Sequence, residues 1–161
     1  MTKKEVLLER LGGQGALRAA VDEFYLRLTG DKQLARFFEG VNIKLLKWHQ
    51  YNFMSIAFTE VPEDMDIEAL IHTKHQKLFD EGLTEEHFDI VAAHFIDTLN
   101  HLGVKQAEID EAVGVIAPLR QVFEREAIEA QKRKQKRIMM WLAILVAVLA
   151  TVAYCFMQQN M

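Results

Sequence analysis

The chain has little cysteine, proline or glycine: one, two and eight residues among 161. The single cysteine, Cys155, excludes an intramolecular disulfide and a structural zinc site built on thiolates. The scarcity of proline and glycine favours a helical protein of one domain and a tail, with few long loops. No apolar stretch like that of a signal peptide follows Met-Thr-Lys-Lys-Glu at the start. The folded part is therefore expected in the cytoplasm.

Charge is unevenly distributed along the chain. The net charge is −4, yet five basic residues lie between Lys132 and Arg137. Without those five, 14 basic residues face 23 acidic ones, a net charge of −9. An acidic domain argues against nucleic-acid binding, whereas the basic stalk suits anionic lipid headgroups.

The segment after the stalk has no charge over 20 residues, 138–157. At about 1.5 Å per residue it would span roughly 30 Å, the thickness of a bilayer core. Trp141 and Tyr154 lie near its ends, and a buried core helix would instead show a polar face. The basic residues in front predict that the domain stays on the cytoplasmic side. We therefore expect a domain over 1–131, a stalk over 132–137, a single transmembrane helix over 138–157 and a short tail over 158–161.

Apolar residues recur at helical spacing throughout the domain, and no strand pattern appears. Asn42 and Thr84 are suited to cap helices, and Pro118 should bend the last one. There is neither a glycine-rich phosphate loop nor a nucleophile elbow. The expected helices cover residues 5–10, a stretch ending near Gly30, a short turn within 31–39, then 43–58, 67–80, a stretch from Thr84 to Gly103, and about 106–131.

Four polar side chains lie on or beside these apolar stripes: Tyr25, His49, Gln50 and His75. Apolar faces rarely admit such groups unless a ligand or hydrogen bond satisfies them. Haem needs an apolar slot, an axial nitrogen and control of the opposite face. This pattern favours His75 as the iron ligand, and Tyr25 and Gln50 as donors to a bound gas. Phe38 would pack on the porphyrin. Two roles stay open for His49, a sixth iron ligand when no gas is bound or a solvent-edge histidine at the mouth of the pocket.

Several short segments, in this order, resemble the group I truncated haemoglobins over roughly residues 7–123. The resemblance implies an all-α fold, a 2-over-2 helical sandwich around haem b. The segments are Leu11-Gly12-Gly13, Ala20-Val21-Asp22-Glu23-Phe24-Tyr25, Leu34-Ala35-Arg36-Phe37-Phe38, His49-Gln50, His75-Gln76, Gly82-Leu83-Thr84 with His87-Phe88, and Gly114-Val115-Ile116-Ala117-Pro118-Leu119.

The resemblance also implies roles for individual residues. His75 matches the proximal ligand, Tyr25 and Gln50 the distal hydrogen-bond network, and His49 the sixth ligand of cyanobacterial members. The haem pocket would be lined by Phe24, Phe38, Leu46, Phe53, Phe88, Val91, Phe95 and Ile116.

The chain departs from the family pattern in three respects. The glycine pair after the distal helix is absent, because Phe58 is followed by Thr59-Glu60-Val61-Pro62. The loop before the proximal helix is short, which leaves the propionate contacts open. A membrane anchor is not a usual family feature and would imply a task at the membrane.

The expected function is binding of dioxygen, nitric oxide or carbon monoxide at haem iron. Two uses beyond oxygen binding or transport remain open. One is nitric oxide dioxygenation with an unidentified reductase. The other is electron transfer or sensing by a bis-histidine haem. The rival from another class is a haem-free, tail-anchored helical adaptor. His87, His94 and His101 recur every seven residues and are expected to be exposed.

Overall fold

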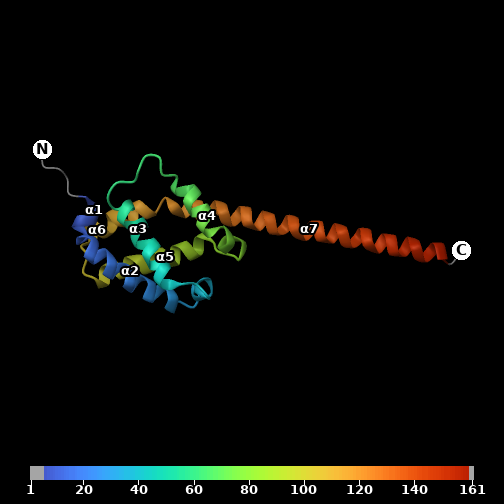
Figure 1. Cartoon of the computed structure of the whole chain (residues 1–161), viewed down its shortest axis with the longest axis horizontal. Helices are drawn as coiled ribbons and strands as arrows, with labels where there is room; N and C mark the ends of the chain where they lie inside the picture. Colours follow the sequence, from blue (N-terminus) through green and yellow to red (C-terminus); the bar gives the residue numbers. More distant parts are fainter. Residues whose placement is uncertain (1–5, 160–161) are drawn as a thin grey trace.

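The computed structural model describes residues 6–159, with side chains described up to Thr151. This part of the chain is helical and contains no strand, so the all-α prediction is confirmed (Figure 1). The elements are α1 (Leu7–Arg10), α2 (Gly13–Gly30), a 3₁₀ helix η1 (Ala35–Phe38), α3 (Ile43–Ala57), α4 (Ile67–Asp80), α5 (Glu85–His101), α6 (Gln106–Ile116) and α7 (Leu119–Gln159).

Local sequence signals set the ends of α3 and α4. The side chain of Asn42 accepts a hydrogen bond from the Leu45 backbone N–H at 3.1 Å, as predicted. Asp66 caps α4 in the same way, through the N–H of Ala69 at 2.9 Å. At the other end of α4, Gly82 has a φ of 100°, a left-handed conformation that glycine adopts without strain. These signals fix the length of α4, the helix that carries His75.

The helix predicted over 106–131 is in fact two helices. α6 ends at Ile116 and α7 starts at Leu119, with Pro118 between them. Proline breaks the helix here, rather than bending it, because it has no N–H to donate and its ring clashes with the preceding turn. α7 then continues through the stalk as one helix to Gln159.

Within the globular part, α2 and α5 each contact several other helices. α2 packs against both α3 and α5, and α5 packs against α6 and α7. The partner of α4 is α7, and the two helices lie side by side where α7 leaves the globular part (Figure 1).

Buried apolar side chains form two separate clusters. The larger, here called the main cluster, includes Phe24, Tyr25, Met54, Phe58 and Phe95 from α2, α3, the end of α3 and α5. The smaller, here called the α4–α7 cluster, consists of Ile71, Phe79, Leu83, Val122 and Ala130. Phe37 of η1 borders both clusters. His75 therefore lies on a helix whose core is separate from that of Tyr25.

The transmembrane helix predicted at 138–157 is not supported by the structure. No helix in the described part of the chain holds an apolar stretch long enough to cross a membrane. The side chains of 152–157 lie outside that part. The apolar side chains of α7 between Ile138 and Leu149 are exposed, with Trp141 at 64%. Figure 1 shows this part of α7 running away from the globular part without contacting it.

Candidate functional site

His75 occupies the third turn of α4 with one ring nitrogen engaged. Its Nδ1 lies 3.0 Å from the backbone carbonyl oxygen of Ile71. A carbonyl can only accept, so Nδ1 carries the proton and Nε2 keeps its lone pair. In the part of the chain that is described, Nε2 has no hydrogen-bond partner. The imidazole is thus held in the tautomer that can bind a metal through Nε2.

Aromatic rings surround the imidazole of His75. The ring centroids of Phe123 and Phe79 lie 5.5 Å and 6.3 Å from it, and Phe88 contacts Phe123 in turn at 5.1 Å. Burial among these groups lowers the pKa of His75, and the Ile71 carbonyl offsets part of that effect. The imidazole therefore stays neutral, as an iron ligand must be.

Tyr25 is almost completely buried in the main cluster, at 4% exposure. Its ring meets those of Phe24 and Phe38 edge-on at 5.8 Å and 6.1 Å. Burial raises the pKa of its hydroxyl to about 12, so the group remains a hydrogen-bond donor. Among the residues that the structure describes, this hydroxyl has no hydrogen-bond partner. An acceptor atom of a bound ligand would therefore find this hydroxyl free to donate a hydrogen bond.

Three of the predicted positions on α3 differ in exposure. Leu46 and Gln50 are half-buried, and the Gln50 amide has no hydrogen-bond partner within the described chain. His49 is exposed, and its ring contacts that of Trp48 with centroids 5.0 Å apart. The helix thus turns Gln50 toward the protein and His49 toward its outer surface.

The predicted pocket residues divide by burial. Phe24 and Phe95 are buried in the main cluster and contact each other at 5.9 Å. The others are apolar yet only half-buried: Phe38, Leu46, Phe53, Phe88, Val91 and Ile116. Half-buried Leu78 and Phe123 border the α4–α7 cluster in the same way. Such part-exposed apolar side chains, on two separate clusters, fit a flat apolar cofactor that covers them.

Two histidines expected at the surface have structural partners that spacing alone did not indicate. His94 Nε2 lies 2.8 Å from Asp31 Oδ2, which ties α5 to the turn after α2 and lowers the pKa of Asp31. His87 Nδ1 accepts a hydrogen bond from the Thr84 N–H at 3.1 Å, in a capping box that normally uses Glu or Gln. The sequence does contain a signal for this contact, because His87 comes three residues after Thr84, the residue expected to cap the helix. The prediction of exposed histidines was therefore wrong for His87 and His94.

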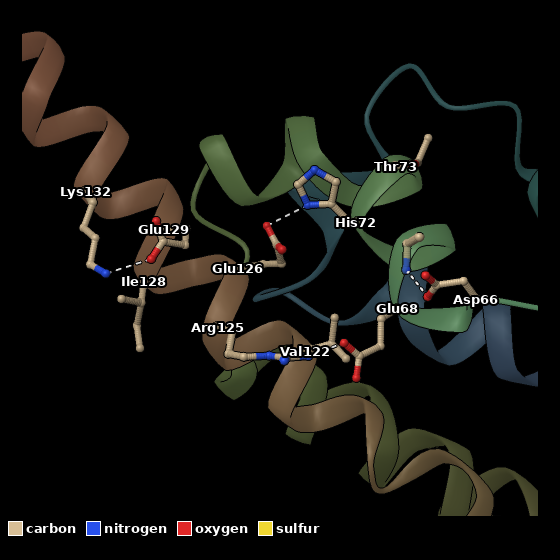
Figure 2. Close-up of a pocket in the computed structure, with 11 residues that line it drawn as sticks. Asp66, Glu68, His72, Thr73, Val122, Arg125, Glu126, Ile128, Glu129 and Lys132 are labelled. Carbon is tan, nitrogen blue, oxygen red and sulfur yellow. Dashed lines mark hydrogen bonds and ion pairs between the residues drawn. The ribbon is translucent and has the colours of Figure 1, made fainter.

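An open polar groove lies between α4 and α7, on the surface of their contact (Figure 2). None of the predicted site residues lines it. Its charged groups are paired with one another: His72 with Glu126 at 2.9 Å, Arg125 with Glu68 at 2.5 Å, and Lys132 with Glu129 at 2.7 Å. The groove is therefore the outer edge of the contact between the two helices and not part of the His75 site.

Comparisons with known proteins agree with this arrangement. Residues 6–125 match the model of the bacterial-like globin family. The group 1 truncated hemoglobin of Mycolicibacterium paratuberculosis is 35% identical over 119 residues, covering 70% of this chain and 79% of that protein.

Two solved structures are similar in fold as well as in sequence. Chlamydomonas reinhardtii THB4 is 40% identical with a TM-score of 0.65, covering 74% of this chain and 95% of that one. The 2/2 hemoglobin of Synechococcus, solved in the cyanomet state with covalently attached heme, is 32% identical with a TM-score of 0.64. That alignment covers 78% of this chain and 99% of the Synechococcus chain. The family match over residues 6–125 and the identity to these relatives show that the chain belongs to the bacterial-like globins, as a group 1 truncated haemoglobin.

Proposed function

We propose that this protein binds haem b through His75 and uses it to bind dioxygen and other diatomic gases. The observation that carries the proposal is the state of two side chains. His75 presents an unpartnered Nε2 beside aromatic rings, and the buried residue Tyr25 presents a hydroxyl with no hydrogen-bond partner in the described chain. A globin needs both groups, one to hold iron and one to contact the gas.

These residues fit haem because of the protonation state of His75 and the apolar side chains that border the two clusters. His75 is neutral and fixed in one tautomer by Ile71, so no proton has to leave before iron is bound. The half-buried apolar side chains bordering the two clusters would cover the faces of the macrocycle and exclude water. The Synechococcus relative, solved with a covalently attached heme, supports a haem cofactor for this protein.

Tyr25 and Gln50 would act on the gas. The Tyr25 hydroxyl stays protonated because of its raised pKa, and Gln50 offers amide N–H groups from the half-buried side of α3. Each would donate a hydrogen bond to a polar diatomic ligand, while Leu46 supplies an apolar neighbour. This arrangement discriminates dioxygen from carbon monoxide, because the more polar ligand gains more from the donors.

Nitric oxide dioxygenation is the enzymatic use that we propose for this site. Ferrous haem supplies the redox chemistry by which dioxygen and nitric oxide become nitrate, and a separate reductase returns the iron to the ferrous state. The residues of this chain would hold dioxygen in place through Tyr25 and Gln50. The reductase would have to donate single electrons to the iron.

Two measurements test the proposal. The purified full chain should carry one haem per chain, and its pyridine adduct should show the bands of haem b. The ferrous protein equilibrated with oxygen should then convert nitric oxide to nitrate stoichiometrically and rapidly. A colourless chain that takes up no haem would identify the haem-free adaptor instead. Haem binding without nitrate formation would leave gas binding as the function and reject the enzymatic use.

We also propose that the tail holds the globin at a membrane, with the domain on the cytoplasmic side. Lys134, Lys136 and Arg137 are exposed, and no acidic partner for them occurs within the described residues. The uncharged side chains from 138 to 149 are exposed as well, which is costly in water. Fractionation of cells should find the full chain with membranes and a chain lacking 138–161 in the soluble fraction. Equal distribution of the two would exclude the tether.

A further inference from the structure

The helix that carries His75 is held mainly by α7. Two ion pairs join the two helices, Glu68 with Arg125 and Asp80 with Arg133, and between them His72 Nδ1 lies 2.9 Å from Glu126 Oε2. Their order is the same along both helices, so α4 and α7 run parallel through the contact. Figure 2 shows His72 of α4 reaching across the groove to Glu126 of α7.

An apolar layer lies beneath these ion pairs. Ile71 and Phe79 of α4 are buried against Val122 and Ala130 of α7. Phe123 of α7 contacts the rings of both His75 and Phe79, at 5.5 Å and 5.4 Å. The position of the His75 imidazole is therefore set by α7 as well as by its own helix.

The contact with α4 continues past the end of the globin-family match. The match stops at residue 125, but Glu126, Ala130 and Arg133 all contact α4. Their spacing of four and then three residues places them on one face of α7. Ala130 is 5% exposed although Glu129 and Lys132 lie close to it in the sequence. Arg133 Nε and Nη2 both donate to Asp80 Oδ1, at 3.2 Å and 2.9 Å.

We propose that residues 126–133, at the start of the extension beyond the globin match, form a proximal clamp that positions the His75 helix. This inference rests on the proposed haem ligation by His75, because the clamp acts on the iron only through that residue. The clamp residues would contact neither haem nor gas, and would act only by holding α4 in place.

The two kinds of contact contribute differently. Half-exposed ion pairs such as Asp80–Arg133 are individually weak. Their main effect is to set which turn of α4 lies beside which turn of α7. The buried side chain of Ala130 sets how closely the helices approach, because a larger or charged group there would separate them. Loss of the clamp would free the C-terminal half of α4, the part that follows His75.

Variants of the full chain test the clamp, with matched controls. Ala130→Glu places a charge in the buried layer, and Gln131→Glu adds the same charge at the exposed neighbouring position. Arg133→Ala removes one ion pair, and Lys134→Ala removes an adjacent cation that has no acidic partner among the described residues. Asp80→Arg combined with Arg133→Asp reverses the pair and should restore what either change alone removes.

The first readout is amide hydrogen exchange in the haem-free protein, so it does not depend on the proposed function. Exchange in peptides from 67–80 should quicken about tenfold in Ala130→Glu and measurably in Arg133→Ala, while peptides from α2 stay unchanged. The reversed pair should return the rate toward that of the parent chain. Unchanged exchange in α4 for both variants would overturn the clamp.

The second readout consists of two measurements on the haem protein. One is the iron–histidine stretching band of the ferrous form, and the other is the rate of haem loss to an acceptor globin. The band should shift or broaden and haem loss should quicken in Ala130→Glu and Arg133→Ala, but not in the two controls. If Ala130→Glu does not fold, Arg133→Ala and the reversed pair decide the question. Faster α4 exchange with an unaltered band would reduce the clamp to a purely structural contact. Absence of any haem in the parent chain would instead reject the proposed function.

Discussion

The Nδ1 atom of His75 lies 3.0 Å from the carbonyl oxygen of Ile71, one turn earlier on α4. This hydrogen bond gives the ring a single orientation and leaves Nε2 as the nitrogen available to iron. Because Ile71 belongs to the α4–α7 cluster, the orientation of the His75 ring is fixed by the same packing that joins α4 to α7. The orientation of the ring and the helix contact are thus coupled through two residues one turn apart.

Replacement of His75 should remove haem ligation. His75→Gly should lower haem affinity by more than the roughly 10- to 100-fold that outer-shell changes alone cause at metal sites. Added imidazole should restore part of the absorption spectrum, because it can occupy the space of the lost ring. His101→Gly is the control, since His101 is exposed at the end of α5 and belongs neither to the predicted site nor to the clamp. An unaltered spectrum in His75→Gly would show that another residue binds the iron.

Replacement of Tyr25 should have opposite effects on gas binding and on stability. Tyr25→Phe should speed dioxygen dissociation roughly 10- to 100-fold, because a hydrogen bond to a charged or strongly polar acceptor contributes about 1.5–3 kcal/mol. The haem-free protein should keep its stability or gain up to about 1 kcal/mol, because the lost hydroxyl has no partner in the described chain. Stopped-flow kinetics and chemical unfolding measure the two effects.

Tyr51→Phe is the matched control for that experiment. Tyr51 is half-buried on α3, with the Arg18 guanidinium 4.5 Å above its ring, outside the predicted site. It should leave dioxygen dissociation unchanged. Equal dissociation rates for Tyr25→Phe and the parent chain would remove Tyr25 from the gas-binding site.

The stability of the haem-free protein should fall as the solution is acidified below about pH 6.5. Burial lowers the pKa of folded His75 below the 6.5 of the unfolded chain, so the unfolded state binds more protons between these values. The free energy of unfolding therefore rises with pH across this interval and levels off above about 6.5. Burial and the Arg36 charge lower the pKa of His87 in the same direction.

Urea unfolding at pH 7.5 and 5.5 measures this dependence. Asp31, Asp89 and Glu129, whose pKa values are also lowered, act only at more acidic pH. His75→Gln should show a smaller loss between the two pH values than the parent chain, and His75→Gln with His87→Gln a smaller one still. A loss of the same size in all three proteins would contradict the assignment to these histidines.

The gas-free ferrous protein should have a five-coordinate, high-spin absorption spectrum. His49 is exposed and its ring rests on Trp48, so it would have to leave that contact to reach iron. His49→Leu should therefore change the spectrum little. A six-coordinate, low-spin spectrum that becomes five-coordinate in His49→Leu would instead establish bis-histidine ligation and favour redox or sensing work.

Sequence alone determined the helices and most of their ends. Asn42 and Gly82 act on the few residues around them, so their effects are readable from the chain, whereas Pro118 was expected to bend a helix that it in fact ends. Helical spacing also placed Tyr25, Gln50 and His75 beside apolar stripes, because periodicity fixes which side chains share a face. The proposal that His75 binds the iron came from this pattern together with the family resemblance.

Tertiary structure decided what depends on contacts between distant segments. The partner of His94 is Asp31, 63 positions away, and the partner of Arg133 is Asp80, 53 positions away. No local pattern encodes such pairs, because they exist only once α4, α5 and α7 have packed. For the same reason no pattern along the chain indicated that α7 holds the His75 helix. Local propensity fixed the elements, whereas burial and pairing across the fold fixed the environment of His75.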